Sequence, residues 1–431
     1  MARRFLVSVT LCLFVIVTRA NAAVATGGEA AILDGAKPLV IGHALTLISE
    51  VLDEQRDVLV YLPGDYGRNQ QPLPVIYLLD GRANFAHTTA TVDLLVVNAR
   101  MPRSMVVGIA NTDRSRDFTA VVTEDRSSGG ADRFLDFFQS ELIPFIEGNF
   151  RTAPHRTVIG HSLGGLFVLH ALVERPDLFD AVVAISPAVT NDERVGDGAL
   201  PISDRLGKVL ADRESWPVSL FITMSDREDA RWTTDLDSIR SVLRGAAPGD
   251  LRWTYREMHG EDHGTTVLGS VYHGLRFINA DWDTSGLVAE GTLDDVTSRF
   301  EDLSARLGFE VRPPEVMVNL LGYRLLGQEQ LDDAVEVFEY NVALYPNSAN
   351  VYDSLGEALE RSGKLPGAMR WYRKAVAQAE QTDDPLVEIF RANLRRVEER
   401  LAGGDPAPTP AFEPTFRESG GERWNSATGV E

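Results

Sequence analysis

Cysteine is almost absent from this sequence: its 431 residues include a single one, Cys12. A chain with one cysteine cannot form an internal disulfide. Long apolar runs are scarce as well, and after residue 22 no stretch is long and apolar enough to cross a membrane. Positive charge is in deficit, since 42 Lys and Arg stand against 63 Asp and Glu and leave a formal net charge of −21. So acidic a chain argues against nucleic acid or an anionic membrane as a partner.

Residues 1–22 have the features of a secretory signal peptide. They begin with the basic pair Arg3-Arg4, continue with an apolar stretch over 5–17, and end in Ala20-Asn21-Ala22, which fits the small-x-small cleavage rule. Because Cys12 lies inside this segment, the mature chain would have no thiol chemistry. We therefore expect an exported protein, periplasmic or secreted. The alternative is a short membrane anchor, for which the apolar stretch has few residues.

Between about residue 40 and residue 285, short apolar runs typical of strands alternate with periodic stretches typical of helices. This alternation predicts an α/β fold, in which helices cover both faces of a mostly parallel sheet. The predicted strands are 44–49, 57–62, 74–79, 104–109, 157–159, 181–185, 218–222 and 251–255, and the predicted helices include 131–148, 203–213, 230–245 and 264–277.

Pro313-Pro314 marks the point where the pattern becomes purely helical and begins to repeat. The repeat has the tetratricopeptide period of 34 residues, with small residues where two helices cross and aromatic residues towards the next unit. The set Gly322, Leu325, Leu331, Ala334, Phe338 and Val342 recurs as Gly356, Leu359, Leu365, Ala368, Tyr372 and Val376. Two repeats are few for a free solenoid, so we expect them to pack on residues 286–311, on the preceding domain or on a second chain. A ligand-free pair of helical hairpins and a peptide-binding groove both remain open.

Ser162 stands in the sequence Gly160-His161-Ser162-Leu163-Gly164, between a β-branched run and a helical pattern. This order predicts a nucleophile elbow, a sharp turn that exposes the serine hydroxyl in front of a helix N-terminus. The backbone N–H of Leu163 is then one expected donor to an oxyanion. The second donor is expected from the loop that follows the third strand, at Gly81 or Arg82.

A nucleophilic serine needs a base to accept its proton and an acid to orient that base. The chain order in α/β-hydrolases is serine, acid, histidine. After the last predicted strand come His259 and His263, and we favour His263 because a helix starts directly after it. His161 is expected to orient or pack rather than act as a base. The acid is expected after the 218–222 strand, where Glu228 is favoured over Asp226.

The acidic cluster at 226–229 could also suggest a metal site, but no histidine or spaced partner supports one. The sequence therefore predicts no metal site at this cluster.

Five motifs occur in the order typical of one family. They are Leu78-Leu79-Asp80-Gly81, Val107-Gly108-Ile109-Ala110-Asn111-Thr112-Asp113-Arg114, Gly160-His161-Ser162-Leu163-Gly164-Gly165, Ser186-Pro187 and Asp262-His263-Gly264. Over residues 40–280 the chain resembles the putative-esterase family of α/β-hydrolases, which includes siderophore esterases, esterase D and mycolyltransferases. The resemblance implies serine ester hydrolysis without a metal or an organic cofactor, with Ser162 as nucleophile, His263 as base and an acid within 226–229.

The chain departs from the family pattern in two places. Ser225 stands where relatives carry the glycine of a Gly-x-x-Glu pattern, and Ala188-Val189-Thr190-Asn191 stands where many carry Ser-Leu-Trp-Trp. An aromatic wall of the acyl pocket would then be missing. The expected layout is a signal peptide (1–22), an α/β-hydrolase domain (23–285), a helical linker (286–314), tetratricopeptide-like repeats (315–401) and a disordered tail (402–431).

The sequence therefore predicts a serine carboxylic-ester hydrolase that works through an acyl-enzyme on siderophore-like or other small acyl esters. One alternative is an acyltransferase that uses the same site. The other is a non-catalytic protein that binds a partner through its repeats. A protein partner or self-association through the repeats is expected in addition to the small-molecule substrate.

Overall fold

The computed structural model describes residues 36, 38–67, 69–120, 128–189, 200–228, 230–282 and 285–403. The predicted signal peptide and nearly all of the predicted tail lie outside these residues. In the described part of the chain, no helix combines the length and the apolar character that a bilayer crossing requires.

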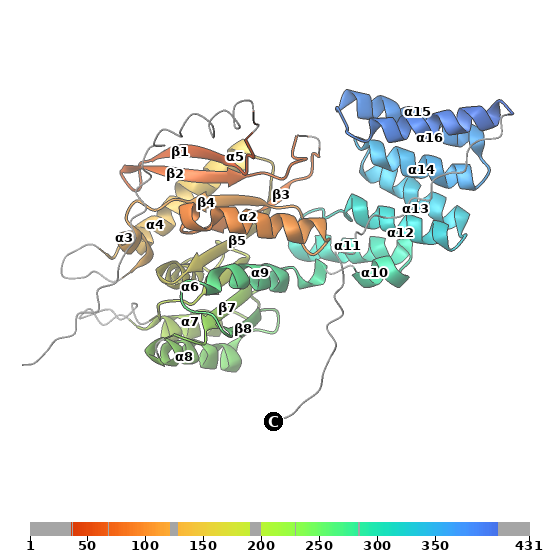
Figure 1. Cartoon of the computed structure of the whole chain (residues 1–431). Coiled ribbons are helices and arrows are strands. Elements are labelled where there is room, and N and C mark those ends of the chain that lie inside the picture. Colours follow the sequence, from red (N-terminus) through yellow and green to blue (C-terminus); the bar gives the residue numbers. More distant parts are fainter. Residues whose placement is uncertain are drawn as a thin grey trace, which may run out of the picture. The chain divides into compact units, whose positions relative to one another are not determined.

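An eight-stranded sheet in the order β1-β2-β4-β3-β5-β6-β7-β8 organises the first part of the chain (Figure 1). Its strands are β1 (His43–Ser49), β2 (Glu54–Tyr61), β3 (Leu73–Leu78), β4 (Met105–Ile109), β5 (Thr152–His161), β6 (Ala181–Ile185), β7 (Ser219–Ser225) and β8 (Arg252–Met258). β2 pairs antiparallel with β1 and with β4, and all other pairs are parallel. The carboxyl ends of the parallel strands therefore meet at one edge of the sheet, where ligands bind in open α/β sheets.

Helices cover both faces of this sheet because three of its strands, β3, β4 and β6, are buried at every position and therefore need cover on both sides. Along β3, Val75 and Tyr77 belong to one buried cluster, and Ile76 and Leu78 belong to the other. The helices are α2 (Gly81–Val97), α3 (Arg114–Phe118), α4 (Ala131–Phe137), α5 (Ile143–Asn149), α6 (Leu163–Glu174), α7 (Ile202–Ala211), α8 (Ala230–Ala246) and α9 (Thr266–Ile278). α2 and α9 lie side by side on one face, while α4 and α6 to α8 supply the core of the other (Figure 1). The predicted α/β-hydrolase fold is confirmed.

An all-helical region of about 100 residues follows. Its helices are α10 (Ser285–Glu290), α11 (Leu293–Leu307), α12 (Glu315–Gly327), α13 (Leu331–Leu344), α14 (Ala349–Arg361), α15 (Leu365–Gln381) and α16 (Val387–Leu401). α12 packs on α13 and α14 packs on α15. A Cβ on Gly322 would lie 2.6 Å from the Phe338 ring, and one on Gly356 would lie 2.8 Å from the Tyr372 ring. The same glycine–aromatic contact thus recurs at the predicted spacing, and the region fits a repeat module.

The core of this helical region also includes side chains of α11. Val296, Phe300 and Leu303 are buried in one cluster with Val318 of α12. The repeats therefore pack on the preceding helical segment, as one of the sequence alternatives expected.

Candidate active site

Ser162 forms a sharp turn between the end of β5 and the start of α6. Its φ of 61° and ψ of −118° lie outside the common regions for a residue with a side chain, and such strain costs about 1–3 kcal/mol. The turn is fixed on both sides, since the Ser162 N–H donates to Ile185 O at 2.9 Å and its C=O accepts from the Ala188 N–H at 3.0 Å. A Cβ on Gly160 would lie only 2.1 Å from Gly164 O, so the glycine at that position of the motif is required by space.

His263 stands in a short loop between β8 and α9, and its side chain meets Glu228. The distance from His263 Nδ1 to Glu228 Oε1 is 2.8 Å, and the Glu228 side chain is only 6% exposed. Asp262 stiffens the loop, because its carboxylate accepts hydrogen bonds from the backbone N–H groups of Gly264 and Thr265. A neutral imidazole held through Nδ1–H by a carboxylate presents Nε2 as a proton acceptor.

Asp226, the other predicted candidate for the acid, contacts a different histidine. Its carboxylate accepts from the Gly260 N–H at 2.9 Å and lies 3.5 Å from His259 Nδ1. The Gly260 hydrogen bond is the main reason that the pKa of Asp226 is lowered. The two carboxylates and the two histidines predicted from sequence are therefore sorted into separate pairs, and only His263 is next to a buried acid. Ser225, which stands where the family pattern has glycine, is buried at the end of β7, and Glu228 still contacts His263.

His161, the residue before the serine, joins the elbow to the loop of His263. Its Nε2–H donates to the backbone C=O of His263 at 2.7 Å, and the two rings lie 4.6 Å apart between centroids. Burial, followed by the charge of His263, lowers the pKa of His161 to about 4. His161 is therefore neutral near pH 7, and it holds the backbone of the candidate base against the elbow.

The segment from Asp80 to Arg82 differs from the predicted loop, because α2 begins at Gly81. Asp80 makes this possible: its left-handed backbone, with φ 52° and ψ 40°, turns the chain directly from β3 into the helix. A Cβ on Gly81 would lie 2.6 Å from the backbone of Gly108, so only glycine fits there. The Arg82 side chain is 67% exposed and pairs with Asp57.

The first backbone N–H groups of α2 and α6 are candidate oxyanion donors. Within the described residues, the N–H groups of Gly81, Arg82 and Leu163 donate to no acceptor. Unpaired N–H groups at a helix N-terminus are the usual donors to an oxyanion or another anion.

A polar network connects these two helix starts. Arg114 donates from Nε and Nη2 to the Asp80 carboxylate at 2.7 and 3.1 Å, and from Nη2 to the backbone C=O of His161 at 2.9 Å. Asn111 also donates to Asp80, at 2.5 Å. Asp80, Asn111 and Arg114 stand in the family motifs of the sequence, but the sequence alone assigns them no role.

Trp232, on α8, is a further residue that sequence reasoning missed. Its indole meets the His263 ring edge to face, with centroids 4.9 Å apart and an interplanar angle of 80°. In the 188–191 segment, where the sequence predicts that an aromatic wall of the acyl pocket is missing, Ala188 and Val189 are buried. Residues 190–191 lie outside the described residues. An aromatic side chain therefore stands beside the candidate base, although it comes from another element than in the family pattern.

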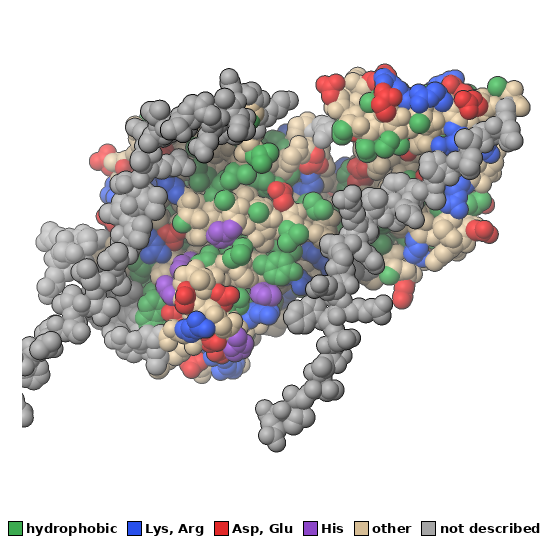
Figure 2. Space-filling model, viewed as in Figure 1, with side chains coloured by type: hydrophobic (Ala, Val, Ile, Leu, Met, Phe, Trp, Pro, Cys, Tyr) green, Lys and Arg blue, Asp and Glu red, His purple; other side chains and the backbone are tan. Residues whose placement is uncertain are grey.

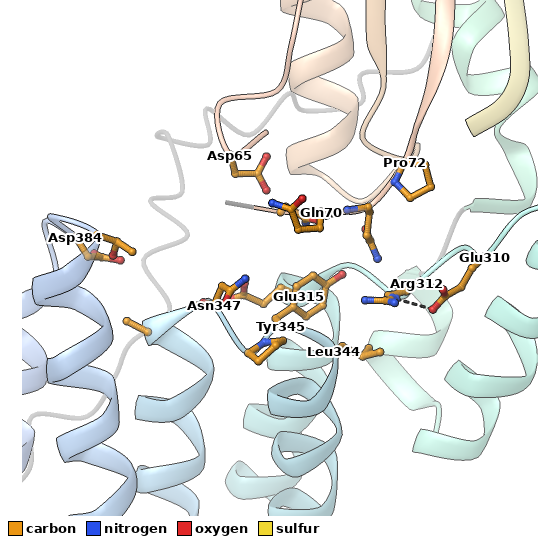
Figure 3. A pocket seen from close by; sticks show the side chains of 16 residues that line it. Asp65, Gln70, Pro72, Glu310, Arg312, Glu315, Leu344, Tyr345, Asn347 and Asp384 are labelled. Atoms are coloured by element: carbon orange, nitrogen blue, oxygen red, sulfur yellow. Dashed lines mark hydrogen bonds and ion pairs between the residues drawn. The ribbon is translucent and has the colours of Figure 1, made fainter. Parts of the chain in front are cut away.

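A cavity of about 640 Å³ lies elsewhere (Figure 3). It is lined by residues of the 65–72 segment and of the helical region, including the ion pair of Arg312 with Glu310. Burial raises the pKa of Glu315, another lining residue. None of the predicted catalytic residues lines this cavity. Among the described residues, no group of three or more His, Cys, Asp or Glu is placed to hold a metal ion.

Comparison with known proteins agrees with this geometry. A sequence model of the family described as "Putative esterase" matches residues 49–264. The chain belongs to this family. Ferri-bacillibactin esterase BesA of Bacillus subtilis is 28% identical over 232 residues, which are 47% of this chain and 78% of BesA. The siderophore triacetylfusarinine C esterase of Aspergillus fumigatus is 26% identical over 244 residues, 49% of this chain and 83% of that enzyme.

A solved structure shows the same relationship. The IroE-like serine hydrolase from Shewanella oneidensis is 25% identical with a TM-score of 0.61, and the match covers 70% of this chain and 98% of that one. The predicted family and the predicted class, an ester-hydrolysing enzyme, are thus confirmed, and the non-catalytic alternative is not. The domain limits and the roles of single residues remain predictions.

Proposed function

We propose that this chain is a serine carboxylic-ester hydrolase with Ser162 as nucleophile, His263 as base and Glu228 as the orienting acid. The observation that carries the proposal is the 2.8 Å contact between His263 Nδ1 and the buried Glu228 carboxylate, in a loop that His161 ties to the elbow. The strained backbone of Ser162 in front of α6 supports it.

The reaction runs in two halves. His263 Nε2 accepts the proton of Ser162 Oγ, which attacks the ester carbonyl, and the N–H groups of Leu163 and of Gly81 or Arg82 stabilise the oxyanion. His263 then gives its proton to the departing alcohol, and an acyl-enzyme on Ser162 remains. In the second half His263 deprotonates a water molecule, which releases the acid and restores the serine. No step requires a metal or an organic cofactor.

Small acyl esters, including esters of the siderophore type, are the proposed substrates. The two siderophore esterases named above support this class. A panel of chromogenic esters of graded acyl length, together with a siderophore trilactone, tests it. Product analysis with added alcohols or sugars separates hydrolysis from acyl transfer, because a transferase would give acylated acceptor instead of free acid.

Replacing the nucleophile tests the mechanism. Ser162→Ala is expected to lose about 10³-fold or more of the kcat on a chromogenic ester and all labelling by a fluorophosphonate probe. Ser241→Ala, an exposed serine on α8, serves as the matched control and should keep both. A Ser162→Ala protein with wild-type kcat would disprove the proposal.

We also propose export through the 1–22 segment, the layout of domains given above, and tetratricopeptide-like packing of the repeats. The basic start and cleavage rule of the segment support export, and the recurring glycine–aromatic contacts support the repeats. The exported protein is expected to begin at Ala23, which N-terminal sequencing of a periplasmic or culture-medium fraction would test. A binding partner or self-association through the repeats remains a prediction.

A further inference from the structure

A second cavity, of about 490 Å³, opens between β8 and α9 at the edge of the sheet. This volume is typical of sites for small molecules. Four of its lining side chains carry or can carry positive charge, namely Arg100, Arg256, His273 and Arg276, and none of the described residues that line it is Asp or Glu. In the space-filling view, blue and purple side chains lie close together in the region of α9 (Figure 2). We call this site the basic cavity.

The basic cavity contrasts with the charge of the whole chain, which is −21. Within the described residues, Arg256 and Arg276 form no ion pair. Arg252 precedes Arg256 by four residues and lies on the same face of β8. By contrast, Arg252 forms an ion pair with Asp281 at 2.9 Å. Asp281 also pairs with Arg306, so the carboxylate next to the cavity is already engaged by two guanidinium groups.

The pKa of His273 reflects the charges around the basic cavity. Burial lowers its pKa, and the charges of Arg256 and Arg276 lower it further. Both guanidinium groups therefore act on the same side chain, and among the described residues no carboxylate is a cause that raises the pKa of His273. A concave site with an excess of positive charge attracts anions.

Apolar rings complete the basic cavity. Phe221 and Phe277 line it, with their ring centroids 5.7 Å apart. A surface that places aromatic rings beside guanidinium groups suits a ligand with both an anionic group and an apolar body, because the rings gain from desolvation and the guanidinium fork matches phosphate and carboxylate oxygens.

The basic cavity is separate from the candidate active site. Arg276 lies in the last turn of α9, whereas His263 precedes its first turn. At a rise of about 1.5 Å per residue, roughly 15 Å of helix separates Thr266 from Arg276. Neither Ser162 nor His263 lines the basic cavity.

We propose that the basic cavity binds a small organic anion, whose phosphate or carboxylate group is held by Arg256 and Arg276 while its apolar body lies on Phe221 and Phe277. Such a ligand is distinct from the neutral ester that the serine site would hydrolyse. The site would therefore serve for recognition or regulation by an acidic metabolite, and it stands whether or not Ser162 is the nucleophile.

Calorimetric titration of the full chain carrying Ser162→Ala tests this proposal, because it prevents turnover. Phenyl phosphate, benzoate and inorganic phosphate are the probes, and benzyl alcohol at the same ionic strength is the neutral comparison. We expect saturable binding of phenyl phosphate or benzoate, weaker binding of inorganic phosphate and none of benzyl alcohol. The tighter of the two aromatic anions identifies the preferred acidic group.

Single-charge variants locate the binding. Arg256→Gln and Arg276→Gln should each weaken binding of the preferred anion about tenfold, the value for loss of one charge-assisted hydrogen-bonding group. Arg244→Gln removes the same charge from an exposed position of α8 outside the basic cavity and should leave binding unchanged. Because Arg256 and Arg276 are exposed, we expect folded variants, which thermal unfolding would verify. No saturable binding of any anion, or equal weakening by Arg244→Gln, would overturn the proposal.

Discussion

The guanidinium of Arg114 donates hydrogen bonds from two nitrogens to the Asp80 carboxylate, and it also donates to the backbone C=O of His161. Asp80 directly precedes the start of α2, and His161 directly precedes Ser162. The Arg114 side chain therefore connects the two chain segments that carry the proposed oxyanion donors. This contact would hold the proposed N–H donors in fixed positions relative to each other, so that they can stabilise the charge that develops on the substrate. Arg114 would do so without contacting the substrate.

Arg114→Lys is expected to lower kcat on a chromogenic ester about tenfold or more and to change KM little. Lysine keeps the charge but cannot supply the planar fork that holds two carboxylate oxygens and a carbonyl at once. Steady-state kinetics measures the effect, and thermal unfolding checks that the fold persists. Arg244→Lys is the control. An unchanged kcat in Arg114→Lys would mean that the network supports stability alone.

Glu228→Gln and Asp226→Asn form a matched pair, since each exchanges a carboxylate for an amide of the same size. Glu228→Gln should lower kcat by about 10²- to 10⁴-fold, because the imidazole loses the group that orients it and stabilises its charged form. Asp226→Asn should change kcat less than about threefold, because Asp226 faces Gly260 and His259 instead. The reverse order of effects would make Asp226 the acid.

The parts of this site that sequence predicts are those that a short segment encodes by itself. The elbow around Ser162 requires only a strand, two glycines and a helix in succession. The placement of His263 and Glu228 follows from a fixed order of elements, since each comes directly after a strand whose carboxyl end reaches the same edge of the sheet.

The hydrogen bonds and ring contacts around the site cannot be predicted from the sequence, because they join segments that are far apart in the chain. Asp80 and Arg114 are separated by 34 residues, and Trp232 reaches His263 from a different helix. The start of α2 at Gly81 also escaped prediction. The decisive feature there is the left-handed backbone of Asp80, which propensity does not foresee, and the apolar residues of 81–97 do not form one clear stripe.

His161 should make folding stability depend on pH. Its pKa is about 4 in the folded chain, against an ordinary value of 6.5, so the unfolded chain binds the proton first as the pH falls. The stabilisation is therefore complete above pH 6.5 and is lost as the pH falls from 6.5 towards 4, by about 3 kcal/mol in total.

His161→Gln provides the comparison, because a glutamine N–H can still donate to the C=O of His263 but does not titrate. The free energy of unfolding of the wild type should fall more steeply than that of the variant across this range, as measured by denaturant titration at several pH values. Parallel curves would show that His161 keeps its ordinary pKa.

Gly322→Ala sets helix propensity against packing. Alanine favours a helix over glycine by about 1 kcal/mol, yet its Cβ would lie 2.6 Å from two atoms of the buried Phe338 ring. Because overpacking costs about 1–3 kcal/mol and Phe338 has no exposed space to move into, we expect net destabilisation and a lower midpoint of thermal unfolding of the helical region. Gly327→Ala, on the same helix with no atom within 4 Å of the added Cβ, should instead be neutral or stabilising. If Gly322→Ala raised the midpoint as much as Gly327→Ala, close glycine–aromatic packing would not be what holds the two helices of the repeat together.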